Sequence, residues 1–201
     1  MLPNQTTNSD LTFLVEFADR ALAAGVDMVQ IRERDLPPRD LLILADALTK
    51  SARRYQASVL INDRADIAGC AGCGVHLTTR SLTVDVIRGA IAEQMLVGVS
   101  THTIEEAMAA QHGRADFVVF GPVFETASKR EYGEPVGIEA LRQAAARLTI
   151  PVLALGGIKD DNFRHALEAG AAGVAGISMF TEAKDLRSVV DAIKATALTK
   201  S

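Results

Sequence analysis

Two short apolar segments that end in glycine and other small residues are the first candidates for chemistry in this sequence. They are residues 151–158 (PVLALGGI) and 172–178 (AGVAGIS). An apolar run without polar alternation is typical of a strand covered on both faces, as in a parallel sheet. Glycine at the strand end lets backbone N–H groups approach a ligand, and such groups beside a helix N-terminus favour an anion. We interpret the two turns as one phosphate site; glycines that only turn the chain are the alternative.

A second group of polar side chains, Gln30, Arg32 and Arg34, alternates along the chain within and after an apolar run. Alternate residues of an extended segment share one face. Two guanidiniums and an amide on one face suit a multiply charged oxyanion such as pyrophosphate, because arginine can bind it through two hydrogen bonds. A solvated charge run with Glu33 and Asp35 is the alternative. We favour the anion site, because a glutamine inside an apolar strand is costly unless it is bonded.

Asn62 and Asp63 follow another apolar run, and His76, Ser100 and His102 also lie near expected strand ends. A carboxylate beside an amide could bind Mg²⁺, which prefers oxygen ligands; an ordinary Asx turn is the alternative. Ser100 could hydrogen-bond an anion or a ring nitrogen. A single histidine at such a position is more often a structural group than a catalyst, and this applies to both His76 and His102. Neither has a serine or cysteine nucleophile at motif spacing, so a hydrolase triad gains little support.

Residues 124–133 (FETASKREYG) form a segment too long for a plain connection between two elements. Thr126, Ser128 and Lys129 place two hydroxyls and an ammonium within four residues. This set suits a mobile lid that closes on phosphate oxygens. A flexible solvated loop is the alternative.

Apolar runs and amphipathic segments alternate along the chain and predict the elements that position these residues. Asp10 is the expected N-cap of the first helix, and Pro37 and Pro38 are expected to open the second. The expected strands begin near residues 28, 58, 74, 95, 117, 151 and 172. The expected helices cover 11–24, 39–55, 83–94, 104–111, 138–147, 161–170 and 185–198, with a short helix before residue 74.

Such alternation predicts an α/β fold with a parallel sheet. Polar residues follow strand after strand, as in a TIM (β/α)₈ barrel. A doubly wound open sheet, the rival, would gather them at one switch point. The first barrel strand is short or missing: either the chain start is truncated relative to its relatives, or residues 1–5 take an irregular part in closure.

Composition predicts a single domain over residues 1–201, since this length suits one hydrophobic core. The net charge of −4 argues against a general nucleic-acid binder. No apolar run approaches the roughly 18 residues of a membrane span, and the N-terminus lacks a signal-peptide pattern. We therefore expect a cytoplasmic protein that binds neither nucleic acid nor membrane. Cys70 and Cys73 form a lone C-x-x-C, which we interpret as buried small residues rather than a redox or zinc site.

Seven short motifs, in order between about residues 11 and 195, resemble the thiamine phosphate synthase family. The motifs are 30–34 (QIRER), 62–64 (NDR), 74–77 (GVHL), 98–102 (GVSTH), 121–122 with 126–129 (GP, TASK), 156–158 (GGI) and 176–178 (GIS). The resemblance implies a (β/α)₈ barrel that joins a hydroxymethylpyrimidine pyrophosphate to a thiazole phosphate and releases pyrophosphate with the help of Mg²⁺. It also implies a dissociative reaction, in which the thiazole nitrogen attacks a pyrimidinyl cation.

The resemblance carries roles to individual residues. Gln30, Arg32 and Arg34 match the strand that binds the pyrimidine pyrophosphate, although the family usually has lysine where Arg34 stands. Asn62 matches a pyrophosphate contact and Asp63 a metal ligand. Three residues, Arg32, Ser100 and Lys129, are expected to act on pyrophosphate and the reaction centre. The expected contacts of the thiazole phosphate are Thr126, Ser128, Gly157, Ile177 and Ser178.

One departure from the family concerns the metal. After residues 74–77 the family normally reads Gly-Gln-Glu-Asp, and that aspartate is the second Mg²⁺ ligand. This chain reads Thr78-Thr-Arg-Ser81, so Ser81 replaces a carboxylate and Arg80 adds positive charge. The loss would weaken Mg²⁺ binding by orders of magnitude, or Arg80 partly replaces the metal.

Two alternatives to the synthase remain open. Residues 31–34 and 120–126 are closer to the sister branch, thiazole tautomerase, which needs no metal. The catalytic histidine of that branch would fall at Pro122, which cannot carry a proton, so His76 or His102 would serve. The second alternative is a non-catalytic or regulatory binder of thiamine-pathway phosphates. A homodimer is compatible with the sequence.

Overall fold

A computed structural model describes residues 8–90, 94–125 and 134–199 of the chain. The chain divides into two compact units, which are described separately. Unit 1 comprises Met1–His76 and Val86–Leu96, and unit 2 comprises Leu77–Asp85 and Val97–Ser201. Among the described residues, no helix is long and apolar enough to cross a membrane.

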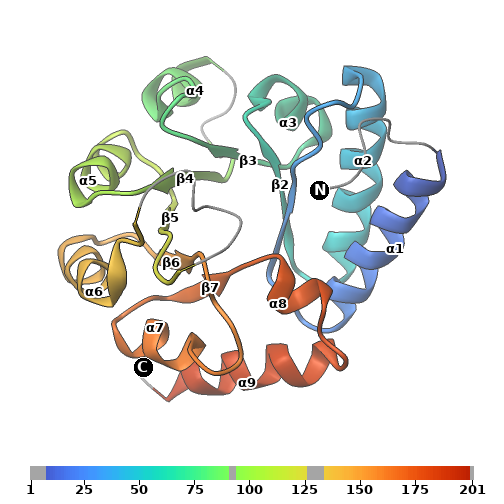
Figure 1. Cartoon of the computed structure of the whole chain (residues 1–201). Helices are drawn as coiled ribbons and strands as arrows, with labels where there is room; N and C mark the ends of the chain where they lie inside the picture. The colour runs from blue at the N-terminus through green and yellow to red at the C-terminus, as the bar shows by residue number, and fades with distance from the viewer. Residues whose placement is uncertain (1–7, 91–93, 126–133, 200–201) are drawn as a thin grey trace. The chain divides into compact units, whose positions relative to one another are not determined.

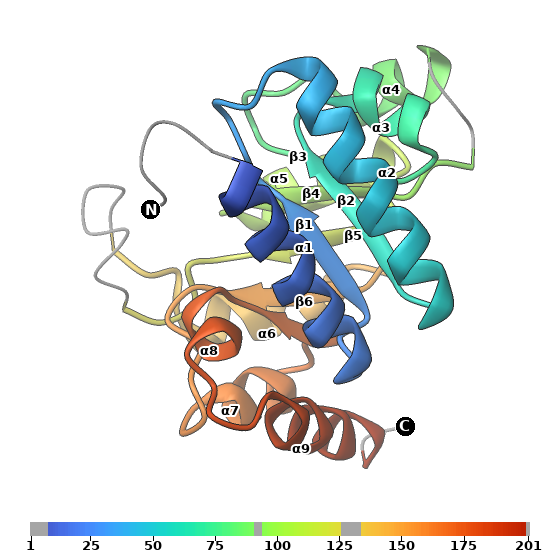
Figure 2. The same cartoon turned by 90° about the vertical axis from the view of Figure 1, so that its right-hand side faces the viewer.

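Unit 1 contains three parallel strands that pair in chain order, β1 with β2 and β2 with β3. The long helices α1 and α2 pack side by side, and α2 also contacts β2 and α3 (Figures 1 and 2). The elements are α1 (Asn8–Ala23), β1 (Met28–Ile31), α2 (Pro38–Arg54), β2 (Ser58–Asn62), α3 (Ala65–Ala71) and β3 (Gly74–Leu77). Helix α4 (Val84–Ala90) lies across the boundary between the two units in the sequence.

The two faces of the unit 1 sheet differ in polarity. Ile31, Ile61 and Val75 lie on one face and are buried. The strand register pairs Gln30 with Leu60, and Asn62 with His76. Paired residues of parallel strands project to the same face, and alternate residues project to opposite faces. Gln30, Asn62 and His76 therefore share the face opposite to Ile31, Ile61 and Val75, together with the buried Leu60.

Unit 2 contains four parallel strands that also pair in chain order, from β4 to β7. Helix α5 packs on β4 and β5, α6 on β6, and both α7 and α9 on β7 (Figure 1). The elements are β4 (Val97–Thr101), α5 (Ile104–His112), β5 (Phe117–Phe120), α6 (Gly137–Arg147), β6 (Val152–Leu155), α7 (Phe163–Glu168), β7 (Gly173–Ala175), α8 (Ser178–Thr181) and α9 (Leu186–Leu198).

Helix ends in both units follow from local residue chemistry. Thr103 accepts a hydrogen bond from the backbone of Glu106, whose side chain in turn accepts one from the Thr103 N–H, and this capping box starts α5. Asp185 caps α9 in the same way through the N–H of Ser188. Proline stands at the start of α2, as predicted, because its missing N–H has no partner to lose there.

The alternation of parallel strands and helices is confirmed, whereas several boundaries were wrong. Helix α1 begins at Asn8, so Asp10 lies inside it and does not cap it. The strand expected from residue 95 runs from Val97 to Thr101, and the four-residue helix α8 was not predicted. Cys70 is exposed and Cys73 half-buried, which corrects the expectation that both are buried. No strand precedes α1 among the described residues, and residues 1–7 lie outside them.

Candidate functional site

The carboxyl ends of β1 and β2 in unit 1 enclose a cavity of about 200 Å³. Four predicted site residues line it together: Arg32, Arg34, Asn62 and Asp63. Gln30 lies beside this group, because its Nε2 donates to Oδ1 of Asn62 at 3.4 Å. The structure therefore brings together all the unit 1 residues that the sequence assigned to pyrophosphate and metal.

A tight turn after β2 positions the Asp63 carboxylate. Asp63 has φ +63°, a left-handed conformation that aspartate and asparagine tolerate better than most residues. Its N–H donates to the carbonyl of His76 at 3.0 Å, which fixes the turn to β3. The Nδ2 of Asn62 donates to Oδ2 of Asp63 at 3.4 Å. The chain thus turns sharply after β2, and the exposed residue Asp63 lines the cavity.

Arg64 is a cavity residue to which the sequence reasoning gave no role. Its Nε and Nη2 donate to the two carboxylate oxygens of Asp66, at 2.9 and 2.7 Å. These bonds lower the pKa of the Asp66 carboxyl. Asp66 itself lies in the first turn of α3. The sequence offered one weak signal for the Arg64–Asp66 pair: an arginine two residues before an aspartate, just after an expected strand.

His76 on β3 is a buried residue, only 6% exposed. Burial is the main cause that lowers the pKa of His76 to about 4; Asp63 opposes the change and nearby Arg32 adds to it. The ring is therefore neutral at pH 7 and a weak proton acceptor there. His102 is exposed instead, and its Nδ1 faces the carbonyl oxygen of Gly121.

Ser100 lies within β4 of unit 2, opposite Val119 of β5, rather than after the strand as expected. Its side chain is half-buried. The three residues predicted for the lid, Thr126, Ser128 and Lys129, lie outside the described residues. Of the expected reaction-centre groups in unit 2, the structure thus describes Ser100 alone.

The first predicted phosphate turn follows β6 and contains two glycines in the left-handed conformation, Gly156 with φ +96° and Gly157 with φ +64°. The carbonyl of Gly156 accepts the Phe124 N–H at 3.0 Å. A Cβ on Gly157 would lie 2.5 Å from the carbonyl oxygen of Glu125, which leaves no room for a side chain. Asn162 secures the turn, because its Nδ2 donates to the Gly157 carbonyl at 2.8 Å.

The second turn follows β7, the strand paired with β6, so both turns lie at the same edge of the unit 2 sheet. Ile177 precedes α8 and Ser178 is its first residue. The Ile177 side chain is 73% exposed, which is unusual for an isoleucine and leaves the backbone around it accessible. N–H groups in the first turn of a helix have no partner within the helix and can donate to an anion.

The side chains available for Mg²⁺ are few. Among the described residues, no three histidine, cysteine, aspartate or glutamate side chains form a cluster that could hold a metal. Ser81, which replaces the family's second aspartate, accepts the Thr78 N–H at 2.6 Å in a local turn. Asp63 supplies one carboxylate beside the amide of Asn62. This set suits a Mg²⁺ ion that takes most of its oxygens from water and a bound phosphate.

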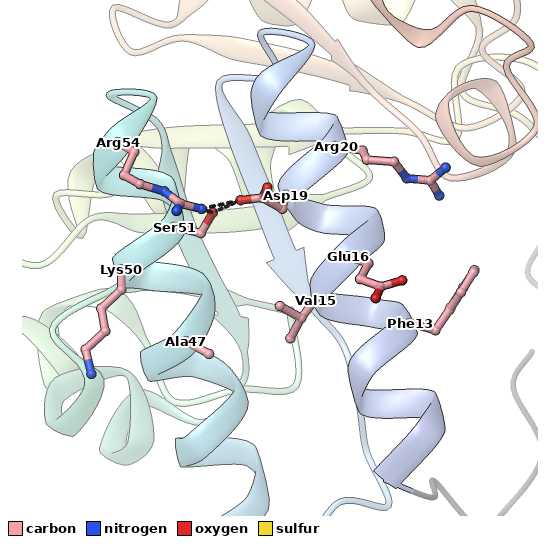
Figure 3. Close-up of a pocket in the computed structure, with 9 residues that line it drawn as sticks. All are labelled: Phe13, Val15, Glu16, Asp19, Arg20, Ala47, Lys50, Ser51 and Arg54. Carbon is pink, nitrogen blue, oxygen red and sulfur yellow. Dashed lines mark hydrogen bonds and ion pairs between the residues drawn. The ribbon is translucent and has the colours of Figure 1, made fainter.

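A larger cavity of about 920 Å³ lies between α1 and α2 and contains none of the predicted site residues. Figure 3 shows Asp19 of α1 facing Ser51 and Arg54 of α2. Arg54 donates to Asp19 at 2.6 Å and to Ser51 at 2.9 Å, and Ser51 also donates to Asp19. The network joins the two helices, and hydrogen bonding by Ser51 lowers the pKa of the Asp19 carboxyl.

The buried neutral imidazole of His76 predicts a pH-dependent stability. A folded-state pKa near 4, below the usual 6.5, stabilises the fold above pH 6.5, and this contribution is lost as the pH falls toward 4. Between about pH 7.5 and about pH 5, the free energy of unfolding should fall in both proteins. We expect the fall to be about 2 kcal/mol larger in the wild type than in His76→Gln. Urea unfolding at each pH, with a metal chelator present, measures this free energy. The exposed His165→Gln variant should keep the wild-type slope; an equal slope in His76→Gln would contradict the assignment.

The crowded backbone at Gly157 predicts that alanine is poorly tolerated there. Gly157→Ala should destabilise the chain by about 1–3 kcal/mol, because φ is positive and Glu125 blocks the Cβ. Gly89→Ala is the matched control, since nothing lies within 4 Å of its added Cβ and alanine favours the helix by about 0.5–1 kcal/mol. Thermal unfolding compares the two variants. Equal stability would show that the turn differs from the one described.

Comparison with known proteins shows which family the chain resembles. A family model described as thiamine monophosphate synthase matches residues 4–180. A relative from Geobacter sulfurreducens, named "Putative thiamine-phosphate synthase", is 48% identical over 96% of this chain and 89% of its own length. The thiamine-phosphate synthase of Chlorobium phaeovibrioides is 39% identical over 89% of this chain and 86% of its own length.

A solved structure gives the same result. The thiamine phosphate pyrophosphorylase from Pyrococcus furiosus is 31% identical, covers 92% of this chain and 89% of its own, and superposes with a TM-score of 0.82. Sequence and structural similarity therefore agree over nearly the whole length. As the motifs predicted, the chain belongs to the thiamine monophosphate synthase family.

Proposed function

We propose that this chain is a thiamine phosphate synthase, a transferase that condenses hydroxymethylpyrimidine pyrophosphate with thiazole phosphate and releases pyrophosphate. Family membership supports this activity over the tautomerase and the non-catalytic binder. The observation that carries the proposal is the cavity at the ends of β1 and β2, where Arg32, Arg34, Asn62 and Asp63 meet. This set is what a departing pyrophosphate needs.

The first step breaks the bond between the pyrimidine methylene carbon and the pyrophosphate oxygen. The electron pair leaves with the oxygen, so negative charge grows on pyrophosphate while the carbon becomes cationic. Arg32 and Arg34 stabilise that charge, and Asn62 donates a further hydrogen bond. Gln30 positions Asn62 through the bond between their amides and contacts the pyrimidine. No general base is required for this step.

The second substrate would bind through its phosphate to unit 2. Backbone N–H groups at Gly157, Ile177 and Ser178 are placed at two adjacent strand ends and suit a phosphate monoester. Thr126 and Ser128 would add hydroxyl donors. The resemblance assigns Lys129 and Ser100 to pyrophosphate and the reaction centre, and these two roles remain predictions. In the second step the thiazole nitrogen attacks the cationic carbon.

Mg²⁺ fits this scheme with Asp63 as its protein ligand. Bound there, the ion would supply positive charge against pyrophosphate and so assist its departure. The single carboxylate implies weak binding of the free ion, so the metal and the pyrophosphate substrate would bind together.

The (β/α)₈ barrel belongs to the same proposal. In both units the parallel strands pair in chain order, as the strands of a (β/α)₈ barrel do. Small phosphorylated substrates are the expected partners. A cytoplasmic location and a homodimer remain predictions.

A direct assay tests the activity. The full chain is incubated with both substrates, with Mg²⁺ or with a chelator, and thiamine phosphate is measured. We expect product with Mg²⁺ and little without it. If no product forms but thiazole phosphate binds, the synthase proposal fails; a test for conversion between thiazole isomers then separates the tautomerase from a binder.

The proposed metal ligand has its own test. Asp63→Asn should lower synthase activity by about 100-fold or more, because it removes the carboxylate while asparagine tolerates the same backbone conformation. Binding of thiazole phosphate, measured by calorimetry, should not change. Asp46→Asn is the matched control, since this exposed carboxylate pairs with Lys50 on the surface of α2. Full activity in Asp63→Asn would contradict the metal role.

A further inference from the structure

Arg64 is a third arginine that lines the unit 1 cavity, in addition to Arg32 and Arg34. It stands at the N-cap of α3, directly after the metal-ligand candidate Asp63. The carboxylates near these three cations are Glu33 and Asp63, which also line the cavity, and Asp66, which pairs with Arg64. The family resemblance assigned no role to Arg64.

Asp66 fixes the plane of the Arg64 guanidinium. Two of its five N–H groups, one on Nε and one on Nη2, are used by the two oxygens of Asp66. Three N–H groups remain for another acceptor in the same plane. The Arg64 side chain is 41% exposed, so a ligand entering the cavity can reach it. A planar donor held in this way loses little freedom when it binds a phosphate oxygen.

Pyrophosphate, the anion proposed for this cavity, carries several negative charges, and a third guanidinium would balance more of that charge than Arg32 and Arg34 alone. A guanidinium is suited to this, because it binds phosphate oxygens through paired N–H donors.

We propose that Arg64, oriented by Asp66, is a third guanidinium that binds the pyrophosphate of the substrate. Arg64 is then a substrate-binding residue and Asp66 a positioning residue. The inference rests on the proposed synthase function, since it requires that this cavity receives pyrophosphate.

The test measures binding of inorganic pyrophosphate with excess Mg²⁺ to the full chain by calorimetry, and KM for each substrate in the synthase assay. Arg64→Gln should weaken pyrophosphate binding about tenfold or more and raise KM for the pyrimidine pyrophosphate similarly. KM for thiazole phosphate should stay unchanged. Asp66→Asn should weaken pyrophosphate binding less, about threefold to tenfold, because Arg64 keeps its charge but its guanidinium is no longer held in one orientation.

The control is Arg142→Gln, which removes the same charge from a surface pair with Glu139 on α6. It should bind pyrophosphate like the wild type. If Arg64→Gln does not fold, judged by circular dichroism, Arg64→Lys decides: it keeps the charge but loses the planar guanidinium that pairs with Asp66 through two N–H groups, and we expect pyrophosphate binding to weaken about threefold or more.

Wild-type affinity in the Arg64 variant that folds, or an equal loss in Arg142→Gln, would overturn the inference. An equal rise in KM for thiazole phosphate would do the same, since it would indicate a general structural effect. A wild-type chain that neither binds pyrophosphate nor makes thiamine phosphate would instead refute the proposed function itself.

Discussion

The negative charge that develops on a departing pyrophosphate is the constraint on which this site depends. A dissociative step needs fixed positive groups where that charge appears, and it needs them before the bond breaks. Parallel strands meet the need because their carboxyl ends lie at one edge of the sheet. In unit 1, the register that pairs Asn62 with His76 and Gln30 with Leu60 brings Arg32, Arg34 and Asp63 to a single cavity.

In the proposed scheme the two units bind anions in two different ways. Unit 1 would use guanidiniums and an amide, which suit an anion whose charge rises during the reaction. Unit 2 offers backbone N–H groups beside Gly157 and Ser178, which suit a phosphate that stays unchanged. The second way requires bare backbone: Gly157 lies so close to Glu125 that any side chain would collide with it. His76 is buried in unit 1 and neutral at pH 7, so it adds no charge there.

Much of this could be predicted from the sequence, because apolar runs mark buried strands wherever they occur. The strand at Phe117–Phe120 has the predicted bounds, and Gln30, expected to be hydrogen-bonded because it lies in an apolar strand, donates to Asn62. Helix α8 could not be predicted, since four residues carry no helical period. Asp10 was misassigned as a cap because Asn8 and Ser9 can start a helix equally well. The depressed pKa of His76 and the orientation of Arg64 depend on residues distant in sequence or on rotamers, which no pattern reveals.

The most direct measurement is a crystal structure of the full chain grown with Mg²⁺, pyrophosphate and thiamine phosphate. The account predicts pyrophosphate against Arg32 and Arg34, with the metal on Asp63, and the phosphate of thiamine phosphate at the N–H groups of Gly157 and Ser178. Both anions bound elsewhere, with these groups facing only solvent, would contradict it.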